Sequence, residues 1–274
     1  MNRAQTALSK WRWRRQHGVD PGEAAPVYLV GLQRSGTNML ARGIETAPEF
    51  EVHNENDRAA FHRYRLRSDG TVAGLIARSR HRYVLLKPLC DSHRIDELLD
   101  TLPVSQPGRA VWAYRDVDGR VRSAINKFGD ANLQVLSEIS RGEGLRRWQA
   151  QRISSENREL VRSFDYSTMS AETAAALFWY IRNCLYFEIG LDNRSDTFLS
   201  SYDLLTLEPE QTMQALCAFL GFPYDPALTE HIERRSNSRK PQLLIDPRVR
   251  RSCDELTERL DSSARQDVRR WSAA

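Results

Sequence analysis

The feature that most constrains the fold is an apolar run followed at once by a basic, glycine-containing loop and a helix-forming stretch. Residues 27–31 form the apolar run, and residues 38–46 have a helical pattern. The loop between them reads Leu32-Gln33-Arg34-Ser35-Gly36-Thr37. Unpaired N–H groups in the first turn of a helix, together with the helix dipole, stabilise an anion at such a place. The order strand, loop, helix therefore predicts a phosphate-binding loop.

This loop begins like that of a nucleoside triphosphatase and then departs from the pattern. The lysine that should follow Gly36 is absent, Thr37 comes one position early, and a cation, Arg34, stands inside the loop. A triphosphatase uses that lysine on the β- and γ-phosphates and the following hydroxyl on Mg²⁺. We therefore expect this loop to hold a phosphate-like group by another scheme.

Three segments together carry a family resemblance. Arg34-Ser35-Gly36-Thr37 resembles the donor loop of sulfotransferases that use 3′-phosphoadenosine 5′-phosphosulfate (PAPS). Arg115, followed eight positions later by Ser123, resembles the family's 3′-phosphate motif. A softer match reads Tyr202-Asp203-Leu204 and then Phe219-Leu220-Gly221. The matches span roughly residues 27–226 in the family's order, and the chain resembles a bacterial-type member similar to carbohydrate and tyrosyl-protein sulfotransferases.

Short apolar runs that alternate with longer helical patterns predict an α/β fold with a parallel sheet and crossover helices. A length of 274 residues fits one such domain. The resemblance implies the same architecture: a single domain with a central parallel sheet flanked by helices, like that of P-loop NTPases. The expected strands are 27–32, 50–54, 82–87, 110–115 and 197–202, and the expected helices include 171–191, mostly apolar and so buried, and 207–220, ended by Gly221.

Composition suggests how the chain is divided. We expect a basic N-terminal extension over residues 1–26 and a sulfotransferase domain over 27–274. Within that domain, residues 131–168 lack a long apolar run and predict helices that cover the active-site side. Residues 236–251 contain two prolines and predict a late loop before a charged final helix.

The N-terminal extension contains an alternation of tryptophan and arginine, Trp11-Arg12-Trp13-Arg14-Arg15. Tryptophan and arginine together favour a membrane interface, so peripheral association with a membrane is one interpretation. A frayed basic terminus and a helix packed on the domain are the two others.

Charge and cysteine content exclude several classes of protein. The net charge is +4, but 40 basic residues are mixed with 36 acidic ones, which argues against nucleic acid as a partner. No apolar run approaches the roughly 20 residues that span a bilayer, and the N-terminus has no apolar signal core. The four cysteines are widely spaced, which predicts neither a zinc site nor a disulfide framework and favours a cytoplasmic protein.

The donor-binding residues follow from the resemblance. It implies that Arg34, with the main-chain amides of Ser35, Gly36 and Thr37, holds the 5′-phosphate and the bridging oxygen. Asn38 replaces the usual hydroxyl residue, and its amide can still donate to phosphate. Arg115 and Ser123 would bind the 3′-phosphate, although Arg115 could instead pair with Asp116 or Asp118. The late-loop residues that could close over the same phosphate, or could equally be solvated charges, are Arg239 and Lys240.

The general base is expected just after the second strand. Glu55 has the position of the catalytic glutamate in tyrosine-modifying members, and burial can make a carboxylate a better base for a hydroxyl. His53 is the chemical competitor, and it would share a face with Glu55 if the strand continues. Asp91 and His93 are further alternatives. Lys87 ends the third strand, where the family places a lysine that positions the sulfuryl group.

These residues predict an enzyme that moves a sulfuryl group from PAPS to a hydroxyl or amine in line, without a metal, and releases adenosine 3′,5′-bisphosphate (PAP). A P-loop kinase or phosphotransferase and a non-catalytic nucleotide-binding member of the fold are the alternatives. The acceptor stays open among carbohydrates, lipids, peptides and small molecules. A crevice lined by Arg182 or by the Arg-rich segment 141–162 would indicate an acidic acceptor.

Overall fold

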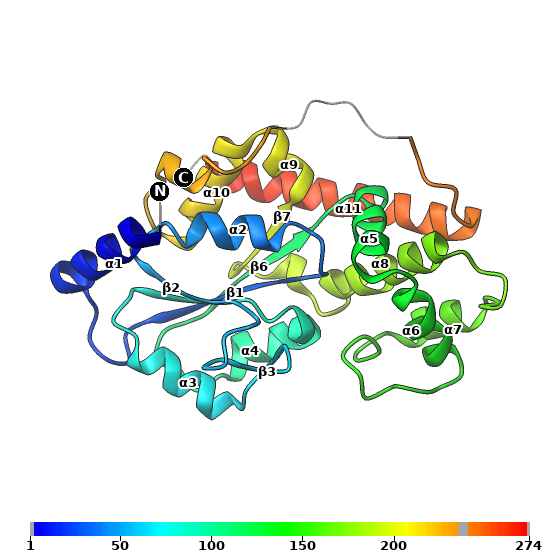
Figure 1. Cartoon of the computed structure of the whole chain (residues 1–274), viewed down its shortest axis with the longest axis horizontal. Coiled ribbons are helices and arrows are strands. Elements are labelled where there is room, and N and C mark those ends of the chain that lie inside the picture. Colours follow the sequence, from blue (N-terminus) through cyan, green and yellow to red (C-terminus); the bar gives the residue numbers. More distant parts are fainter. Residues whose placement is uncertain (1–2, 235–240, 273–274) are drawn as a thin grey trace.

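A five-stranded, wholly parallel sheet forms the centre of the molecule (Figure 1). The structure is a computed structural model, and it describes residues 3–234 and 241–272. The strands run in the order β2-β5-β1-β6-β7. Their bounds are β1 Ala25–Gly31, β2 Phe50–His53, β5 Tyr83–Leu86, β6 Arg109–Tyr114 and β7 Thr197–Ser201. The predicted parallel sheet is confirmed, because all five expected strands are present to within two residues at either end.

The central strand, β1, is buried on both faces because its side chains are apolar on both. Val27 and Leu29 face one side and Tyr28 and Val30 the other, and all four are at most 1% exposed. Such a continuous apolar strand is typical of a parallel sheet covered by helices on both faces. Its position between β5 and β6 brings the carboxyl ends of three strands to one edge.

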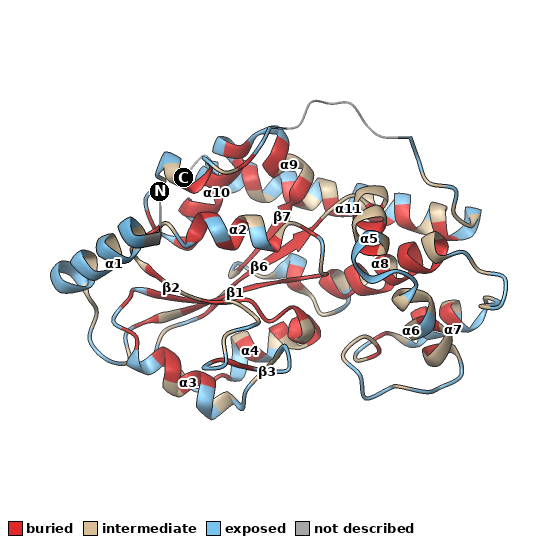
Figure 2. Cartoon of the chain, in the orientation of Figure 1, coloured by how far each residue is buried: buried red, intermediate tan, exposed pale blue. Residues whose placement is uncertain are grey.

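Helices cover both faces of the sheet. The face of Val27 and Leu29 packs against α2 (Thr37–Ile44) and α10 (Pro209–Leu220). The face of Tyr28 and Val30 packs against α3 (Asp69–Arg78), α4 (Ile95–Thr101), α5 (Val117–Phe128) and α8 (Ala171–Glu188). Figure 2 shows the strands buried between these helices, whose outer surfaces are exposed. Two further short elements are helix α9 (Tyr202–Leu207) and a hairpin of β3 (Phe61–His62) and β4 (Arg65–Leu66).

Helix α8 was expected as a long buried helix, and it is one. The Ser170 hydroxyl caps it by accepting from the amide of Thr173, and the helix ends at Glu188, three residues before the predicted end. On its outer side lie α6 (Ala131–Ser140) and α7 (Ser155–Arg162), the helices of the segment 131–168 (Figure 1). Helix α10 ends as predicted at Gly221, whose left-handed φ of 79° suits glycine.

The final helix, α11 (Pro247–Ser272), begins earlier than the sequence suggested. The predicted late loop, 236–251, is therefore wrong at its C-terminal end. Proline fits the first turn of a helix because its missing N–H would have no partner there. The Asp246 carboxylate accepts from the amide of Arg248 at 2.8 Å, which stabilises the start.

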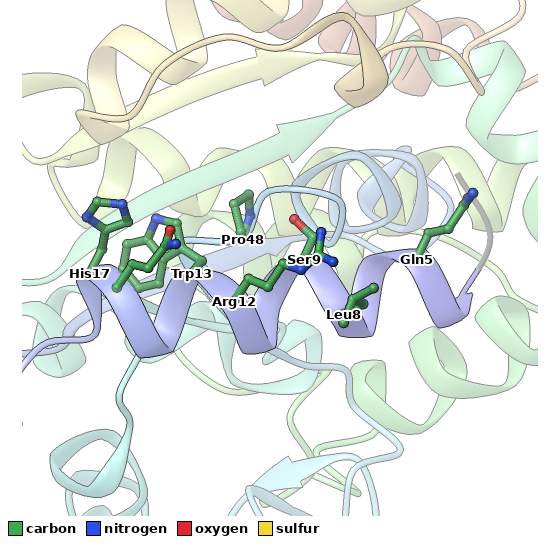
Figure 3. Close-up of a pocket in the computed structure, with 8 residues that line it drawn as sticks. Gln5, Leu8, Ser9, Arg12, Trp13, His17 and Pro48 are labelled. Atoms are coloured by element: carbon green, nitrogen blue, oxygen red, sulfur yellow. The ribbon is translucent and has the colours of Figure 1, made fainter.

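The N-terminal extension forms a helix, α1 (Arg3–His17), and β1 begins at Ala25, inside the expected extension. Trp13 stacks on His81, with ring centroids 6.1 Å apart and planes 2° from parallel. A hollow of ≈ 390 Å³ lies along α1 beside Pro48 (Figure 3). Leu8 and Trp11 are about half exposed. Of the three interpretations, the structure shows a packed helix, and membrane association stays a prediction; no described helix is long and apolar enough to cross a bilayer.

The stacked Trp13 predicts a small, local loss of stability on mutation. Trp13→Ala should lower the free energy of unfolding by about 1–2 kcal/mol and speed tryptic cleavage within α1, because the helix loses its aromatic contact with the domain. Urea unfolding and limited proteolysis measure both effects. The matched control is Trp11→Ala, on the exposed side of the same helix. Equal effects of the two substitutions would show that α1 is not held through Trp13.

Candidate active site

The loop after β1 has a conformation that few residues tolerate. Arg34 has a φ of 74° and Gly36 a φ of 88°, both in the left-handed region, and α2 begins directly afterwards at Thr37. A left-handed φ is uncommon for arginine and is associated with functional sites. At Gly36 a Cβ atom would lie 2.5 Å from Cδ2 of Tyr202. Only glycine fits there, so no side chain covers the main chain beside the N-terminus of α2.

The two segments expected to bind the donor meet directly. Nε of Arg34 donates to Oγ of Ser123 at 2.9 Å, across a sequence separation of 89 residues. Ser35 is 1% exposed, and its Oγ has no hydrogen-bond partner among the residues that the structure describes. A buried hydroxyl without a partner is costly unless a ligand or water satisfies it. The loop therefore fits an oxygen-rich anion.

A serine on the neighbouring segment holds the start of this loop. Ser92 lies in the short helix η1 (Leu89–Arg94); its Oγ accepts from the amide of Gly31 at 3.0 Å and lies 3.1 Å from the Gly31 carbonyl. On the other side, a Cβ at Gly31 would lie 2.2 Å from the carbonyl oxygen of Ala113. The start of the loop is therefore packed between η1, which follows β5, and strand β6, and this packing limits the motion of the loop.

Lys87, expected at the end of the third strand, follows β5 and is 3% exposed. Its Nζ donates to Oδ1 of Asn38 at 2.5 Å and lies 3.8 Å from Oε1 of Glu55. Burial lowers the pKa of Lys87, and the Glu55 carboxylate partly opposes that change. The structure therefore brings Glu55, Lys87 and the donor loop together. Asn38 supplies its carbonyl oxygen to Lys87, whereas the sequence suggested that its amide donates to phosphate.

Arg115 directly follows β6, at the same edge of the sheet. Its guanidinium lies 4.3 Å from the centre of the Tyr202 ring, and its Nε is 3.8 Å from Oδ2 of Asp116. The indole of Trp179 in α8 donates to the main-chain carbonyl of Arg115 at 2.9 Å, which positions this turn. The expected alternative, an ion pair of Arg115 with Asp116 or Asp118, is therefore present with Asp116, whereas Asp118 pairs with Arg250 at 2.8 Å.

Tyr202 and Asp203, which belong to the softer match, lie beside the loop after β1 and the turn after β6. Tyr202 touches the place where Gly36 lacks a side chain and also lies under Arg115. Oδ2 of Asp203 accepts from the amide of Asp116 at 2.9 Å. The sequence signal for this role was the Tyr-acidic-Leu pattern directly after a strand.

Arg120 also lies at this edge, although no sequence motif indicated it. This side chain is 1% exposed and donates to the carbonyl oxygen of Ala175 at 3.0 Å, to Oδ1 of Asn132 at 3.1 Å and to the carbonyl of Gln33 at 3.5 Å. Burial, followed by the charge of Arg34, lowers the pKa of Arg120 to about 9, so the cation persists at neutral pH. The sequence feature that could have indicated Arg120 is its place among the apolar residues of a predicted helix, next to Val121.

His53 is held by acids on both sides, which makes it a poor general base. Its Nδ1 lies 2.6 Å from Asp57 and its Nε2 3.0 Å from Glu51. Burial alone would lower the pKa of His53, but these two carboxylates outweigh burial and raise it. Strand β2 ends at His53, so the condition under which His53 and Glu55 would share a strand face is not met.

Four further candidates from the sequence are Asp91 and His93, which follow β5, and Arg239 and Lys240. Asp91 is buried and accepts from Nε of Arg65 at 2.7 Å, which is a structural role. His93 is 5% exposed and lies in η1. Arg239 and Lys240 lie outside the described residues. Within the described ranges no three His, Cys, Asp or Glu side chains are grouped to hold a metal ion.

Comparison with known proteins adds a distant likeness. No protein-family model matches the sequence, and no curated protein matches it. Among solved structures, the chain is similar to the sulfotransferase domain from the Synechococcus PCC 7002 olefin synthase, with a TM-score of 0.40 and 12% sequence identity. The likeness covers 93% of this chain and 98% of the other. Likeness of this degree does not identify an activity, so any assignment of function depends on the residues and distances of this chain.

The close contact at Gly36 predicts that a single added methyl group strongly destabilises the protein. Gly36→Ala should destabilise the protein by about 2 kcal/mol or more, because alanine resists the left-handed φ and would collide with Tyr202. Urea unfolding measures the loss. Gly70→Ala in α3 is the matched control, since no atom lies within 4 Å of its Cβ position; it should be neutral or stabilising. A neutral Gly36→Ala would refute the tight contact.

The two carboxylates that contact His53 predict that the stability of the protein depends on pH. A raised pKa in the folded state gives stability that is fully present below the ordinary value of 6.5 and is lost as pH rises through the folded value. The difference in unfolding free energy between wild type and His53→Gln should therefore shrink above pH 6.5. Urea unfolding across this range measures it, with exposed His62→Gln as the control. A difference that grows with pH would contradict the assignment.

Proposed function

We propose that this chain is a sulfotransferase that uses PAPS as its donor. The observation that carries the proposal is the direct contact of the two donor-like segments, Arg34 with Ser123, beside Lys87 and Glu55 at one edge of the sheet. An open parallel sheet binds ligands outside the carboxyl ends of its strands, and these residues follow β1, β5 and β2 there. The 3′-phosphate, which ATP lacks, would be bound by Arg115 and Ser123.

The roles of the residues follow from where charge develops. The acceptor oxygen forms a bond to sulfur while the bond from sulfur to the 5′-phosphate oxygen breaks, and PAP leaves with the electron pair. Glu55 takes the acceptor's proton. Arg34, Lys87 and the amides at Gly36 and Thr37 stabilise the charge that grows on the departing phosphate. The unpartnered Oγ of Ser35 is a further donor to a phosphate oxygen.

Glu55 suits the role of base better than His53 does. Its carboxylate is about a quarter exposed and lies 3.8 Å from buried Lys87, whereas both nitrogens of His53 already contact carboxylates. A base must be within hydrogen-bond reach of the acceptor proton, which favours the accessible group. The proposal therefore assigns proton removal to Glu55 and a structural role to His53.

Ligand binding tests the donor before any acceptor is known. PAP should raise the thermal midpoint of the wild type, and ATP with Mg²⁺ should raise it less, since only PAP carries a 3′-phosphate. Protection by ATP with Mg²⁺ and none by PAP would favour a kinase or other phosphotransferase. Strong binding of PAP without transfer to any acceptor in a cell extract, measured with labelled PAPS, would favour a non-catalytic nucleotide-binding protein.

Two substitutions test the chemistry. Arg34→Ala should lower kcat/KM for sulfuryl transfer by about a hundredfold to a thousandfold, since one donor to the developing charge is lost. Glu55→Gln should lower kcat by about a hundredfold or more and leave PAP binding intact. Arg42→Ala, an exposed cation on α2, is the control and should have little effect. Full activity of Glu55→Gln would remove it from the role of base.

A further inference from the structure

Arg182 is a buried cation that lacks a counter-ion. It lies in α8, is 3% exposed, and its Nη1 donates to the main-chain carbonyls of Gln151 at 3.1 Å and Gln149 at 3.5 Å. Within residues 3–234 and 241–272 it makes no ion pair, and its other two nitrogens have no protein acceptor. The ring of Trp148 covers the guanidinium, with the centroid 5.4 Å away. Burying a charge is unfavourable unless it meets an opposite charge.

Nearby arginines differ from Arg182, because each is neutralised. The four cations that act on His93 are Arg182, Arg65, Arg94 and Arg152. The last three contact carboxylates at 2.7 to 3.1 Å, namely Asp91, Asp69 and Asp96. Among the described residues, the lack of a contacting carboxylate therefore distinguishes Arg182 from these three arginines, although the charge of Glu188 on the same helix acts on it. A purely structural arginine in this neighbourhood would be expected to have a carboxylate, as its neighbours have.

Polar atoms without partners accompany this cation. Nδ1 of His93 and the side-chain oxygens of Gln149 and Gln151 are buried, and none has a hydrogen-bond partner in the described part of the chain. Burial, and then the charge of Arg182, lowers the pKa of His93 to about 3, so the ring is neutral at neutral pH. Buried polar atoms are normally paired, so three orphans beside one unpaired cation indicate a site for a polar ligand.

Cys90 connects this cluster with the reacting groups. Its thiol lies within electrostatic reach of both Glu55 and Arg182, and its sulfur accepts from the side-chain amide of Gln33 in the donor loop at 3.8 Å. Cys90, Gln149 and Gln151 are each partly exposed, so the cluster borders solvent. Cys90 is therefore near both Glu55 and Arg182, and its hydrogen bond with Gln33 joins it to the loop after β1.

We propose that Arg182, with His93, Gln149 and Gln151, forms an acceptor subsite for a hydroxyl compound that carries a carboxylate or similar anionic group. This inference rests on the proposed sulfotransferase function and names its substrate class. The anionic group pairs with the free side of the Arg182 guanidinium, hydroxyl groups donate to the glutamine oxygens, and the hydroxyl to be sulfated reaches Glu55. A neutral acceptor would leave Arg182 without its counter-ion, so the subsite discriminates by charge.

Matched acceptors with and without a carboxylate test the inference. One pair is methyl glucuronoside and methyl glucoside, and the other is para-hydroxyphenylacetate and para-cresol. The first pair tests a sugar acid as the acceptor, and the second tests a phenolic acid. With wild-type protein and labelled PAPS, the acidic member of at least one pair should have a kcat/KM about tenfold or more above its neutral partner. In the presence of PAP, the same acid should also raise the thermal midpoint more than its neutral partner does.

Two variants assign the preference to this subsite. Arg182→Met should remove the preference for the acid while PAP binding and transfer to the neutral partner persist. Gln151→Glu keeps Arg182 and offers it an internal carboxylate, so it should raise the thermal midpoint and weaken binding of the acid, even if Arg182→Met folds poorly. Arg152→Met removes a nearby cation that is already paired with Asp96, and it should keep the preference.

The outcomes separate the two proposals. Failure of PAP to stabilise the wild type contradicts the proposed function itself. If PAP binds but neither acid is bound or preferred, or if the preference survives in both Arg182→Met and Gln151→Glu, the anionic subsite is overturned. Loss of the preference in Arg152→Met to the same degree would show a general effect of surface charge, and that too would overturn the assignment to Arg182.

Discussion

Parallel pairing of β1 with β5 and β6 is the constraint on which the rest of the site depends. Tyr28 pairs with Leu86 on one side, and Gly31 pairs with Ala113 on the other. Parallel strands in register end at the same edge, so the loop after β1, Lys87 and Arg115 must emerge side by side. A slip of one residue would turn the buried side chains of β1 to the opposite face, and burial on both faces opposes that. The position of the candidate site is thus a consequence of sheet register.

Helix α8 is the second element that organises this edge. Trp179 positions the turn at Arg115, the carbonyl of Ala175 accepts from Arg120, and Arg182 reaches the segment around residue 150. One buried helix therefore supports the proposed donor side through two of these residues and the proposed acceptor side through the third. Because α8 is packed along most of its length, these groups are held before any ligand arrives, which reduces the ordering that binding requires.

Charge is distributed very unevenly between the surface and this edge. The chain has nearly equal numbers of basic and acidic residues, yet the deeply buried charges at this edge are mostly cations: Lys87, Arg120 and Arg182. Arg120 and Arg182 donate to neutral oxygens and make no ion pair among the described residues, and Nζ of Lys87 lies 3.8 Å from Oε1 of Glu55. Such an arrangement raises the local potential without an internal anion to cancel it. Anionic ligands on both sides of the transferred group would complete it.

The sequence by itself determined what depends on neighbouring residues. Apolar runs predicted all five strands, glycine predicted the end of α10, and the loop around Arg34 predicted an anion site, because burial pattern and turn chemistry are local. The tertiary structure alone decided which distant groups meet, namely Tyr202 with Gly36 and Arg120 with Ala175, and it left Arg182 without an ion pair within the described residues. Sequence pattern shows that a side chain is buried, but the partner of a buried polar group is set by the crossing of elements far apart in the chain.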